Sequence, residues 1–545
     1  MISTSNLNKI KPKKTAISLS LIILLGLAIR FYYVPTDLPI ASDGFFDFVY
    51  AAKTVFEGSL PVGYGTTNTG WGNFLSLFFS LSDTSDPFYL MQIQRSLSVI
   101  LSSLTIIPAF FIFRKFVNIR WALFGCLLLI IEPRLLMSSL EGINYQLFFL
   151  LFVLVIALFL TKTKLTLFLS FGCIACATLV RYEGLLLLIP LSTMYFLKFK
   201  DKKSVVKFLG MIFIVIIILA PISVLRIQAT ENLCYETSFG VRCGSDGFTH
   251  DILVGQRFLS HTLNAALGQE VSETAIYLFN ENNEKTDNYA VLFVNKIIVS
   301  FSALLKFIGL ALIPYFAFFV LYNIILRIKN KKSIKLDWDK KMIVFTASIM
   351  FLPALYAYMR GIEEIRYVLI IIPLVCILSI SWTNSISEKI SKNLGVIIIL
   401  MVLVLISSII FIEFEKRDSI HDRESFLVSQ KIVELTNMTN SFHQSGYVKT
   451  AVLSSSWPVL PEAGQNGKLI HVFQKIPTKN YHDLEEFIID SEKSSLKYLV
   501  IDKDNELFDD LRINPAKYPY LVKKFDSGDF DYTNQFSIYE INYEK

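Results

Sequence analysis

The sequence predicts a mainly helical, polytopic membrane protein that carries a soluble α/β domain in its C-terminal part. Hydrophobic residues make up 53% of the 545-residue chain. Apolar stretches of roughly 17–25 residues, the length that crosses a bilayer, recur along the first three quarters. Beyond residue 413 charged residues become frequent and short β-like runs appear. We therefore expect about eleven transmembrane helices within residues 1–414 and an α/β domain in residues 415–545.

Each expected span is an apolar stretch bounded by polar or charged residues. The spans cover residues 15–33, 91–113, 119–137, 143–160, 165–180, 184–197, 205–224, 307–325, 342–359, 365–382 and 394–412. The apolar run of the first is too long for a cleavable signal peptide, and no small-residue cleavage site follows it. We therefore expect the first span to remain as a membrane helix.

Lysine and arginine positions predict the orientation of the spans. Four lysines lie between residues 9 and 14, ahead of the first span, which places the N-terminus in the cytoplasm. If the spans alternate, every inside loop is basic; these loops are 114–120, 162–164, 198–207, 327–341 and 389–392. Loops 34–90 and 226–289 and the C-terminal domain then lie outside the cytoplasm. The net charge of +6 is mostly this orientation signal and gives no support for nucleic-acid binding.

The exterior regions hold the remaining expected elements. In loop 34–90 we expect a helix at 45–56, with Asp43 near its N-terminus, and an interfacial helix at 74–81. Residues 251–267 are expected to be helical, and 288–300 to form an amphipathic helix. The C-terminal domain is expected to hold strands at 451–454, 469–473, 498–502 and 536–542 and a helix at 483–491. The glycosylation sequon at 437–439 gives the exterior placement weak support.

Two of the six cysteines are candidates for a disulfide. Cys234 and Cys243 both lie in the expected exterior loop 226–289, where an oxidising environment would allow them to close a small hairpin. The other four fall within expected spans, where a thiol behaves as a small hydrophobic group.

Four groups of charged residues fall on the expected outer side of the bundle. They are Asp43 with Asp47; Glu132, Arg134 and Glu141; Arg181, Tyr182 and Glu183; and Arg360, Glu363, Glu364, Arg366 and Tyr367. Short connections hold the last three groups near the membrane surface, so we expect all four to converge on one cavity. For the acidic pair the alternative is capping of a helix N-terminus, and for each arginine it is snorkelling at a helix end.

These residue types suit transfer of a group from a phosphate carrier. Arginine binds phosphate oxygens with two parallel donors, and a carboxylate can deprotonate an acceptor hydroxyl as a general base. A second acid can orient the acceptor or hold a divalent ion. The sequence lacks the motifs of other common enzyme classes. It has no H-E-x-x-H zinc motif, no Walker loop and no G-x-S-x-G elbow.

The chain resembles the GT-C glycosyltransferases. Within them it is most similar to the group of protein O-mannosyltransferases and lipid A aminoarabinose transferases, and to the archaeal relatives of that group. The layout corresponds over about the first 415 residues. The residues that carry the resemblance are Ser42-Asp43-Gly44-Phe45-Phe46-Asp47 with Ala51, Ala52 and Gly58; Val180-Arg181-Tyr182-Glu183-Gly184; and Arg366-Tyr367 with Pro373.

The resemblance implies that a sugar leaves a polyprenyl or dolichyl phosphate carrier outside the cytoplasm. Asp43 matches the family's catalytic acidic position in the first exterior loop, and Glu141 is a candidate second acid. Arg181 and Arg366 fall where basic residues could bind the lipid phosphate. The acidic motif is D-G-x-x-D and not the D-E of many mannosyltransferases, which leaves the acceptor class open. The W-W-D-x-G motif of oligosaccharyltransferases is absent, which argues against transfer of a whole glycan to asparagine.

We therefore expect an integral membrane hexosyl- or pentosyltransferase whose acceptor is a protein, a lipid or another glycan. Asp43 would act as base or acceptor-orienting acid, assisted by Asp47 or Glu141, and Arg181, Arg366 and Tyr367 would bind the carrier phosphate. Glu132, Arg134 and Glu183 are further candidates. This pattern is compatible with an enzyme that uses a divalent cation and with one that uses no metal. The rival interpretations are a transporter or flippase for lipid-linked saccharides, with the same arginines and no base, and a non-catalytic membrane scaffold.

Overall fold

A computed structural model gives the arrangement of the chain. It describes residues 12–38, 40, 43–57, 69–82, 84, 86–230, 234–237, 240–243, 289–313, 316, 337–359, 364–386, 394–415, 420, 424, 427–428, 431, 435, 449–451, 474–475, 483–492, 496–502, 506–530 and 532–543. The chain divides into two compact units. Unit 1 is Met1–Tyr33, Leu60–Phe74 and Ser96–Phe414, and unit 2 is Val34–Ser59, Leu75–Arg95 and Glu415–Lys545.

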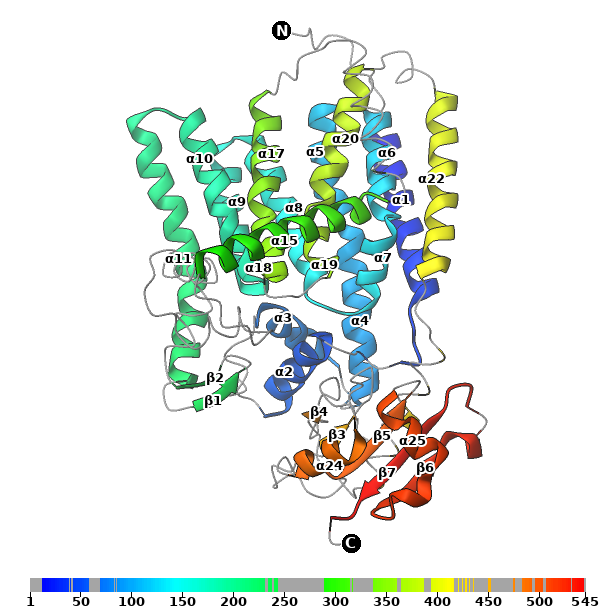
Figure 1. Ribbon diagram of the computed structural model, residues 1–545. Coiled ribbons are helices and arrows are strands. Elements are labelled where there is room, and N and C mark those ends of the chain that lie inside the picture. The colour runs from blue at the N-terminus through cyan, green and yellow to red at the C-terminus, as the bar shows by residue number, and fades with distance from the viewer. Residues whose placement is uncertain are drawn as a thin grey trace. The chain divides into compact units, whose positions relative to one another are not determined.

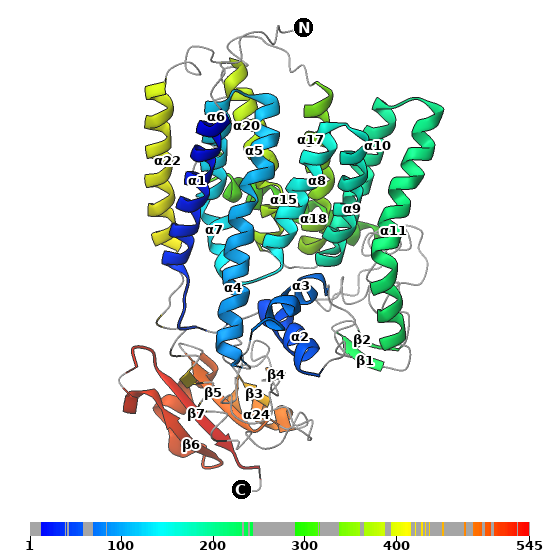
Figure 2. The same ribbon diagram turned by 180° about the vertical axis from the view of Figure 1, so that it is seen from behind.

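The helices of unit 1 form a bundle, in which most of the long helices run side by side (Figures 1 and 2). The main ones are α1 (Pro12–Tyr33), α5 (Ile106–Phe116), α6 (Ile119–Ile130), α7 (Pro133–Leu140), α8 (Tyr145–Thr161), α9 (Lys164–Val180), α10 (Leu188–Lys198), α11 (Lys202–Thr230), α15 (Tyr289–Ala311), α17 (Trp338–Met350), α18 (Leu352–Met359), α19 (Arg366–Leu369), α20 (Ile372–Ile386) and α22 (Leu394–Glu415). The helix α4 (Pro87–Leu104) leads into α5.

Fewer membrane-crossing helices are found than the eleven expected. Among the described residues four helical stretches are long and apolar enough to cross a bilayer, and a bent pair brings the number to five. The four are Lys13–Tyr33, Phe88–Phe116, Lys203–Val224 and Trp338–Met359. Several expected spans form shorter apolar helices; α8, for example, has 17 residues and so rises by only about 26 Å. The structure therefore supports a polytopic membrane protein, and the count of eleven stays a prediction.

The expected span at 119–137 is not a single straight helix, because the chain bends by 49° between α6 and α7. Glu132 lies at the break, where its carboxylate accepts a hydrogen bond from the Leu135 N–H at 2.6 Å. Pro133 occupies the first turn of α7, where the missing N–H of proline costs nothing. A side-chain cap followed by proline therefore starts a new helix here.

A single helix, α15, replaces the expected amphipathic helix at 288–300 and the beginning of the expected span at 307–325. It runs crosswise to the long helices (Figure 1) and packs against α18 and α19. Most of residues 314–336 lie outside the described part of the chain. The expected helix at 251–267 and the sequon at 437–439 lie outside it too.

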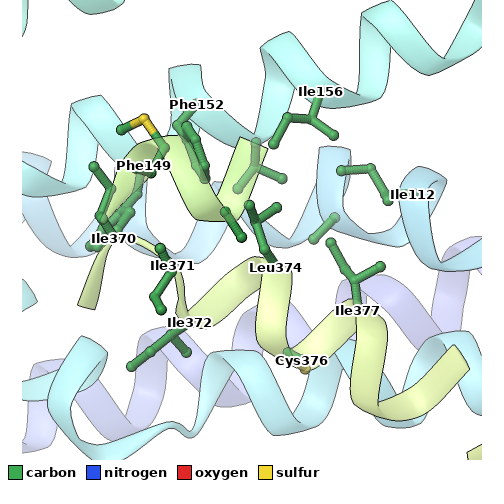
Figure 3. Close-up of a cluster of buried hydrophobic side chains, with 14 of the residues drawn as sticks. Ile112, Phe149, Phe152, Ile156, Ile370, Ile371, Ile372, Leu374, Cys376 and Ile377 are labelled. Carbon is green, nitrogen blue, oxygen red and sulfur yellow. The ribbon is translucent and has the colours of Figure 1, made fainter. Parts of the chain in front are cut away.

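The core of unit 1 is a continuous apolar cluster. Figure 3 shows Phe149, Phe152 and Ile156 of α8 near Leu374 and Ile377 of α20. Branched and aromatic side chains of this kind interdigitate at high density, which fixes the helix ends that carry the polar residues described below.

Unit 2 contains a five-stranded mixed sheet in the order β4-β3-β5-β7-β6. Its strands are β3 (Lys449–Ala451), β4 (Gln474–Lys475), β5 (Tyr498–Asp502), β6 (Leu521–Asp526) and β7 (Phe536–Ile541). The strand β3 pairs in parallel with β4 and β5, while β7 pairs antiparallel with β5 and β6. The helix α24 (Leu484–Glu492) buries Phe487 and Ile488 in an apolar cluster with Leu499 and Ile501. The α/β character is as expected, and β6 is a strand that the sequence analysis missed.

Candidate functional site

The acidic motif begins a helix, α2 (Asp43–Glu57), in unit 2. The helix starts at Asp43 itself, two residues earlier than expected. Asp47 follows one turn later and is 8% exposed, while Phe48 and Ala51 are fully buried. The side chain of Asp43 lies outside the described part of the structure. A carboxylate kept this far from water is costly unless it has polar partners, so Asp47 is more than a solvated surface acid.

Two polar residues of α4 hold the start of α2 and the segment ahead of it. The Gln94 amide donates to the Gly44 carbonyl at 2.8 Å. The Arg95 guanidinium, 3% exposed, donates to the carbonyls of Pro35 and Leu38 at 2.8 and 2.9 Å. These bonds fix the main chain within the acidic motif, at Gly44, and in the segment ahead of it. The sequence analysis missed Gln94 and Arg95, although polar residues inside an apolar helix are a recognisable signal.

In unit 1, Arg181 is the centre of a compact polar group that we call the Arg181 cluster: Asn144, Tyr145, Arg181 and Glu183. Arg181 Nη2 lies 2.6 Å from Glu183 Oε1, and Nη1 donates to Asn144 Oδ1 at 3.1 Å. The guanidinium carbon stands 4.1 Å from the centre of the Tyr145 ring, a cation–π distance. The buried Arg181 Nε has no acceptor among the described residues. A guanidinium has five N–H groups, so donors remain for a further ligand.

Two glycines allow the backbone to close around this cluster. A Cβ on Gly184 would lie 2.6 Å from the Thr178 nitrogen, so only glycine lets the turn η1 (Tyr182–Leu187) fold back on α9. A Cβ on Gly70, at the start of α3 (Gly70–Phe79), would overlap the Leu179 carbonyl. Close backbone contacts therefore hold the residues on either side of Arg181.

The loop before α8 is also held by a residue of α3. The Trp71 indole N–H donates to the Gly142 carbonyl at 3.0 Å, and Gly142 has a φ of 70°, which favours glycine. This loop leads directly to Asn144 and Tyr145. The Arg181 cluster is thus assembled from two separate chain segments, 144–145 and 181–183, and α3 contacts the chain just ahead of each, at Gly142 and Leu179.

Arg366 and Tyr367, at the start of α19, lie close enough to interact electrostatically with the cluster. Arg366 forms an ion pair with Glu364, and its guanidinium carbon stands 5.4 Å from the Tyr367 ring centre. Burial alone lowers the pKa of Arg181, but the Glu183 carboxylate and the Tyr145 phenol outweigh that effect and raise it. Arg181 is therefore permanently charged. The third group and the described part of the fourth are brought together; Arg360 and Glu363 lie outside the described residues.

The second group, Glu132, Arg134 and Glu141, lies around α7. Glu132 is fully buried and caps α7. Arg134 donates to the Ile313 carbonyl at 2.7 Å and lies 4.7 Å from the Phe411 ring centre, so it ties α7 to the ends of α15 and α22. Glu141 is exposed at the C-terminal end of α7, next to Gly142. Glu132 and Arg134 thus have packing contacts around α7, and Glu141 lies beside the loop that leads to the Arg181 cluster. A catalytic or binding role for these three residues stays a prediction.

Within the described residues no group of three or more His, Cys, Asp or Glu side chains could hold a metal ion. The Arg181 cluster and the adjacent Arg366 together offer positive charge: Arg181 pairs with Glu183, and Arg366 pairs with Glu364. Such a pair of arginines can bind a phosphate and stabilise the negative charge that it gains as a leaving group. Convergence of the acidic motif with these arginines stays a prediction.

No protein-family model and no curated protein matches this chain. Solved structures do match. An oligosaccharyltransferase from Archaeoglobus fulgidus in the apo form superposes with a TM-score of 0.54 at 12% identity, covering 90% of this chain and 70% of that chain. The same organism's oligosaccharyltransferase AglB, in complex with an inhibitory peptide and a dolichol-phosphate, superposes with a TM-score of 0.54 at 12% identity, covering 97% and 74%.

A third structure, ArnT from Cupriavidus metallidurans bound to undecaprenyl phosphate, superposes with a TM-score of 0.41 at 10% identity, covering 96% of this chain and 97% of that chain. The two oligosaccharyltransferase structures carry the fold assignment. These two oligosaccharyltransferases are GT-C glycosyltransferases, and this chain is similar to them in fold.

Proposed function

We propose that the protein is an integral membrane glycosyltransferase that takes a sugar from a polyprenyl- or dolichyl-phosphate carrier. It transfers that sugar to an acceptor on the extracytoplasmic side. The observation that carries the proposal is the Arg181 cluster, a charged guanidinium held rigidly at a helix end with donors to spare and a second arginine beside it. Charged residues held in place within a membrane bundle mark function more often than they do on a soluble surface.

In this proposal the two arginines bind the carrier phosphate. Arg181 and Arg366 contact its oxygens, and Tyr367 lines the same position. Glu183 keeps the guanidinium of Arg181 in a fixed orientation, because an ion pair at 2.6 Å leaves it little freedom. When the bond between the sugar carbon and the phosphate oxygen breaks, the departing phosphate gains negative charge. The arginines stabilise that charge and so lower the barrier.

The acceptor is activated from the acidic motif. Its hydroxyl or amine attacks the sugar carbon while its proton passes to the Asp43 carboxylate, the general base. Asp47 sits one turn further along α2, where it can raise the basicity of Asp43 or orient the acceptor. Glu141 is the alternative assisting acid. A divalent cation, if the enzyme uses one, would be held by these carboxylates.

The donor class is better supported than the acceptor class. The dolichol-phosphate bound to AglB supports a polyprenol-type carrier for a chain of the same fold. The absence of W-W-D-x-G separates this chain from oligosaccharyltransferases, so we keep protein, lipid and glycan acceptors open, and hexosyl and pentosyl donors as well.

The second candidate is a transporter or flippase of lipid-linked saccharides. The bend between α6 and α7 favours it specifically, since discontinuous helices line the substrate sites of many transporters. The Glu132 cap and Pro133 give that bend a local structural cause, which weakens the argument. The third candidate, a non-catalytic scaffold, does not account for the buried charge and the spare hydrogen-bond donors of the Arg181 cluster.

One experiment separates these functions. The full chain is reconstituted in liposomes with a panel of polyprenyl-phosphate sugars labelled in the sugar and a membrane extract as acceptor. A glycosyltransferase places label in a new glycoside that no longer extracts with the carrier. A flippase moves label across the bilayer still attached to its carrier, and that result would overturn the proposal. A scaffold does neither.

A further inference from the structure

A second charged group lies in unit 1, where α5, α8 and α10 end and α17 begins. We call it the Lys162 site: Lys115, Lys162, Lys198, Trp338 and Asp339. The ends of α5, α10 and α17 reach the same end of the bundle in Figures 1 and 2. The ends of α5, α8 and α10 are far apart in the sequence, and each brings one lysine to the start of α17.

The contacts within the site are specific. Lys162 Nζ lies 2.6 Å from Asp339 Oδ1, and Lys115 Nζ lies 3.8 Å from Asp339 Oδ2. Lys162 and Lys198 stand 4.4 and 5.9 Å from the centre of the Trp338 ring. Lys115 also donates to the Leu160 carbonyl. Trp338 thus contacts the ammonium groups of two lysines, and the Asp339 carboxylate also pairs with two.

The backbone at Lys162 is unusual. Lys162 has a φ of 64° at the C-terminal end of α8, and it is the one non-glycine residue with positive φ among the described residues. Glycine or asparagine normally occupies such a left-handed helix cap, because a Cβ is disfavoured there. A lysine in this position gives up backbone stability to place its side chain against Asp339 and Trp338.

Positive charge is in excess around the site. The four segments that carry and flank its residues, 114–120, 162–164, 198–203 and 337–341, contain eleven basic and three acidic residues. Two of the acids are already engaged: Asp339 pairs with the lysines, and Asp337 caps α17 by accepting from the Lys340 N–H at 2.9 Å. The cluster is thus more than an internal ion pair, and an anion would be attracted to it.

A buried donor points to the same kind of ligand. The indole N–H of Trp338 is buried and has no acceptor among the described residues. The Trp338 ring stacks on Phe159, with centroids 6.0 Å apart, so its orientation is fixed. The N-terminus of α17, which begins at Trp338, adds the positive end of a helix dipole.

We propose that Lys115, Lys162 and Lys198, together with Trp338, bind the phosphate-bearing headgroup of an anionic lipid in the membrane leaflet at this end of the bundle. Lysines beside tryptophan at the ends of membrane helices match the chemistry and depth of that headgroup. The bound lipid connects α17 to the α8–α9 turn and to α10. This site is independent of the proposed glycosyl transfer and makes no use of the Arg181 cluster.

The test is lipid retention by the full-length protein. Purified protein in neutral detergent is titrated with phosphatidylglycerol, and separately with phosphatidylcholine, and bound lipid is counted by native mass spectrometry. The wild type is expected to retain phosphatidylglycerol in preference to phosphatidylcholine. Lys162→Gly, Lys198→Gln and Trp338→Phe are expected each to weaken retention about fivefold.

The variants are chosen so that folding does not decide the result. Glycine suits the left-handed backbone at position 162, and phenylalanine keeps the stack on Phe159 while removing the N–H. Lys164→Gln is the matched control, since Lys164 is an exposed lysine two residues from Lys162, and it should retain lipid as the wild type does. The unfolding temperature of each variant is measured alongside.

The outcomes are distinct. If Lys162→Gly and Lys198→Gln retain phosphatidylglycerol as well as the wild type, the proposal is wrong. Equal weakening by Lys164→Gln would also overturn it, because a diffuse basic surface would then explain the binding. A third arm titrates inorganic phosphate: if phosphate raises the unfolding temperature through Lys162 and phosphatidylglycerol is not retained, the site binds a free anion and the lipid assignment fails.

Discussion

Arg181 and Glu183 form an ion pair within the turn that joins α9 to η1, with Nη2 and Oε1 2.6 Å apart. Two residues apart on a regular helix they would point in different directions, so the pair depends on the extended backbone at Arg181, which has φ −149° and ψ 133°. Gly184 makes that turn possible. The local sequence thus fixes the orientation of one guanidinium, through the motif Val180-Arg181-Tyr182-Glu183-Gly184.

Arg181→Lys should lower kcat/KM for the lipid-phosphate sugar about tenfold or more. Lysine keeps the positive charge but loses the forked donors and the flat contact with Tyr145. Steady-state transfer rates over a range of donor concentrations measure the effect. Arg512→Lys is the matched control, because Arg512 pairs with Asp509 on the exposed surface of the C-terminal domain. Equal rates for Arg181→Lys and the control would remove Arg181 from the donor site.

Gly184→Ala should destabilise the protein by about 2 kcal/mol or more, since an added Cβ meets the backbone of Thr178, which cannot move aside cheaply. Gly309→Ala is the control: its Cβ meets nothing within 4 Å, and alanine in a helix is better than glycine by about 1 kcal/mol. Thermal unfolding in detergent compares the two variants. A Gly184→Ala protein as stable as the wild type would show that η1 does not pack on α9 as described.

Cys234 and Cys243 should be linked by a disulfide. The strands β1 (Cys234–Thr237) and β2 (Gly240–Cys243) pair antiparallel, with the two cysteines directly opposite each other. Opposite residues in such a ladder have Cα atoms about 4.5–5.5 Å apart, a separation that a disulfide can bridge. Peptide mapping without reductant checks this: a linked peptide is expected, and two alkylated free thiols would contradict the exterior placement of this hairpin.

The C-terminal domain should lose stability in acid through Glu424. Burial raises the pKa of Glu424, but hydrogen bonds from Asn534 and Thr533 outweigh it and hold the pKa below the ordinary 4.5. A carboxyl whose pKa is lower in the folded state stabilises the fold above its unfolded pKa, and this contribution is lost as the pH falls through the folded value. Glu424→Gln should therefore flatten the pH dependence of unfolding below about pH 4.5. An unchanged acid profile would contradict the assignment.

The sequence predicted the helices whose limits are set by apolar length, such as α1, α11 and α22. It missed what depends on local breaks or distant partners. The bend between α6 and α7 was visible in principle, since Glu132-Pro133 is a cap followed by proline. The direction of α15 was not, because periodicity does not tell a helix that crosses the membrane from one that runs across the bundle.

Buried polar side chains show the same limit. Arg30, 1% exposed in α1, donates to the Ile130 carbonyl at 2.7 Å. Sequence can mark an arginine in an apolar stretch as costly, but it cannot name a carbonyl a hundred residues away. Likewise it identified Arg181 and Arg366 as candidates, whereas Asn144 and Tyr145, which hold Arg181, carry no motif and emerge only from the packing of α8 on α9.

The measurement that tests the central claim most directly is the rate of sugar transfer in proteoliposomes for Asp43→Asn and Arg181→Gln beside the wild type. Removing the base or the phosphate contact should each slow transfer about a hundredfold. Asp529→Asn, which alters an exposed acid of the C-terminal domain, should leave the rate unchanged. If both site variants transfer sugar at the wild-type rate, the acidic motif and the Arg181 cluster are not the active site.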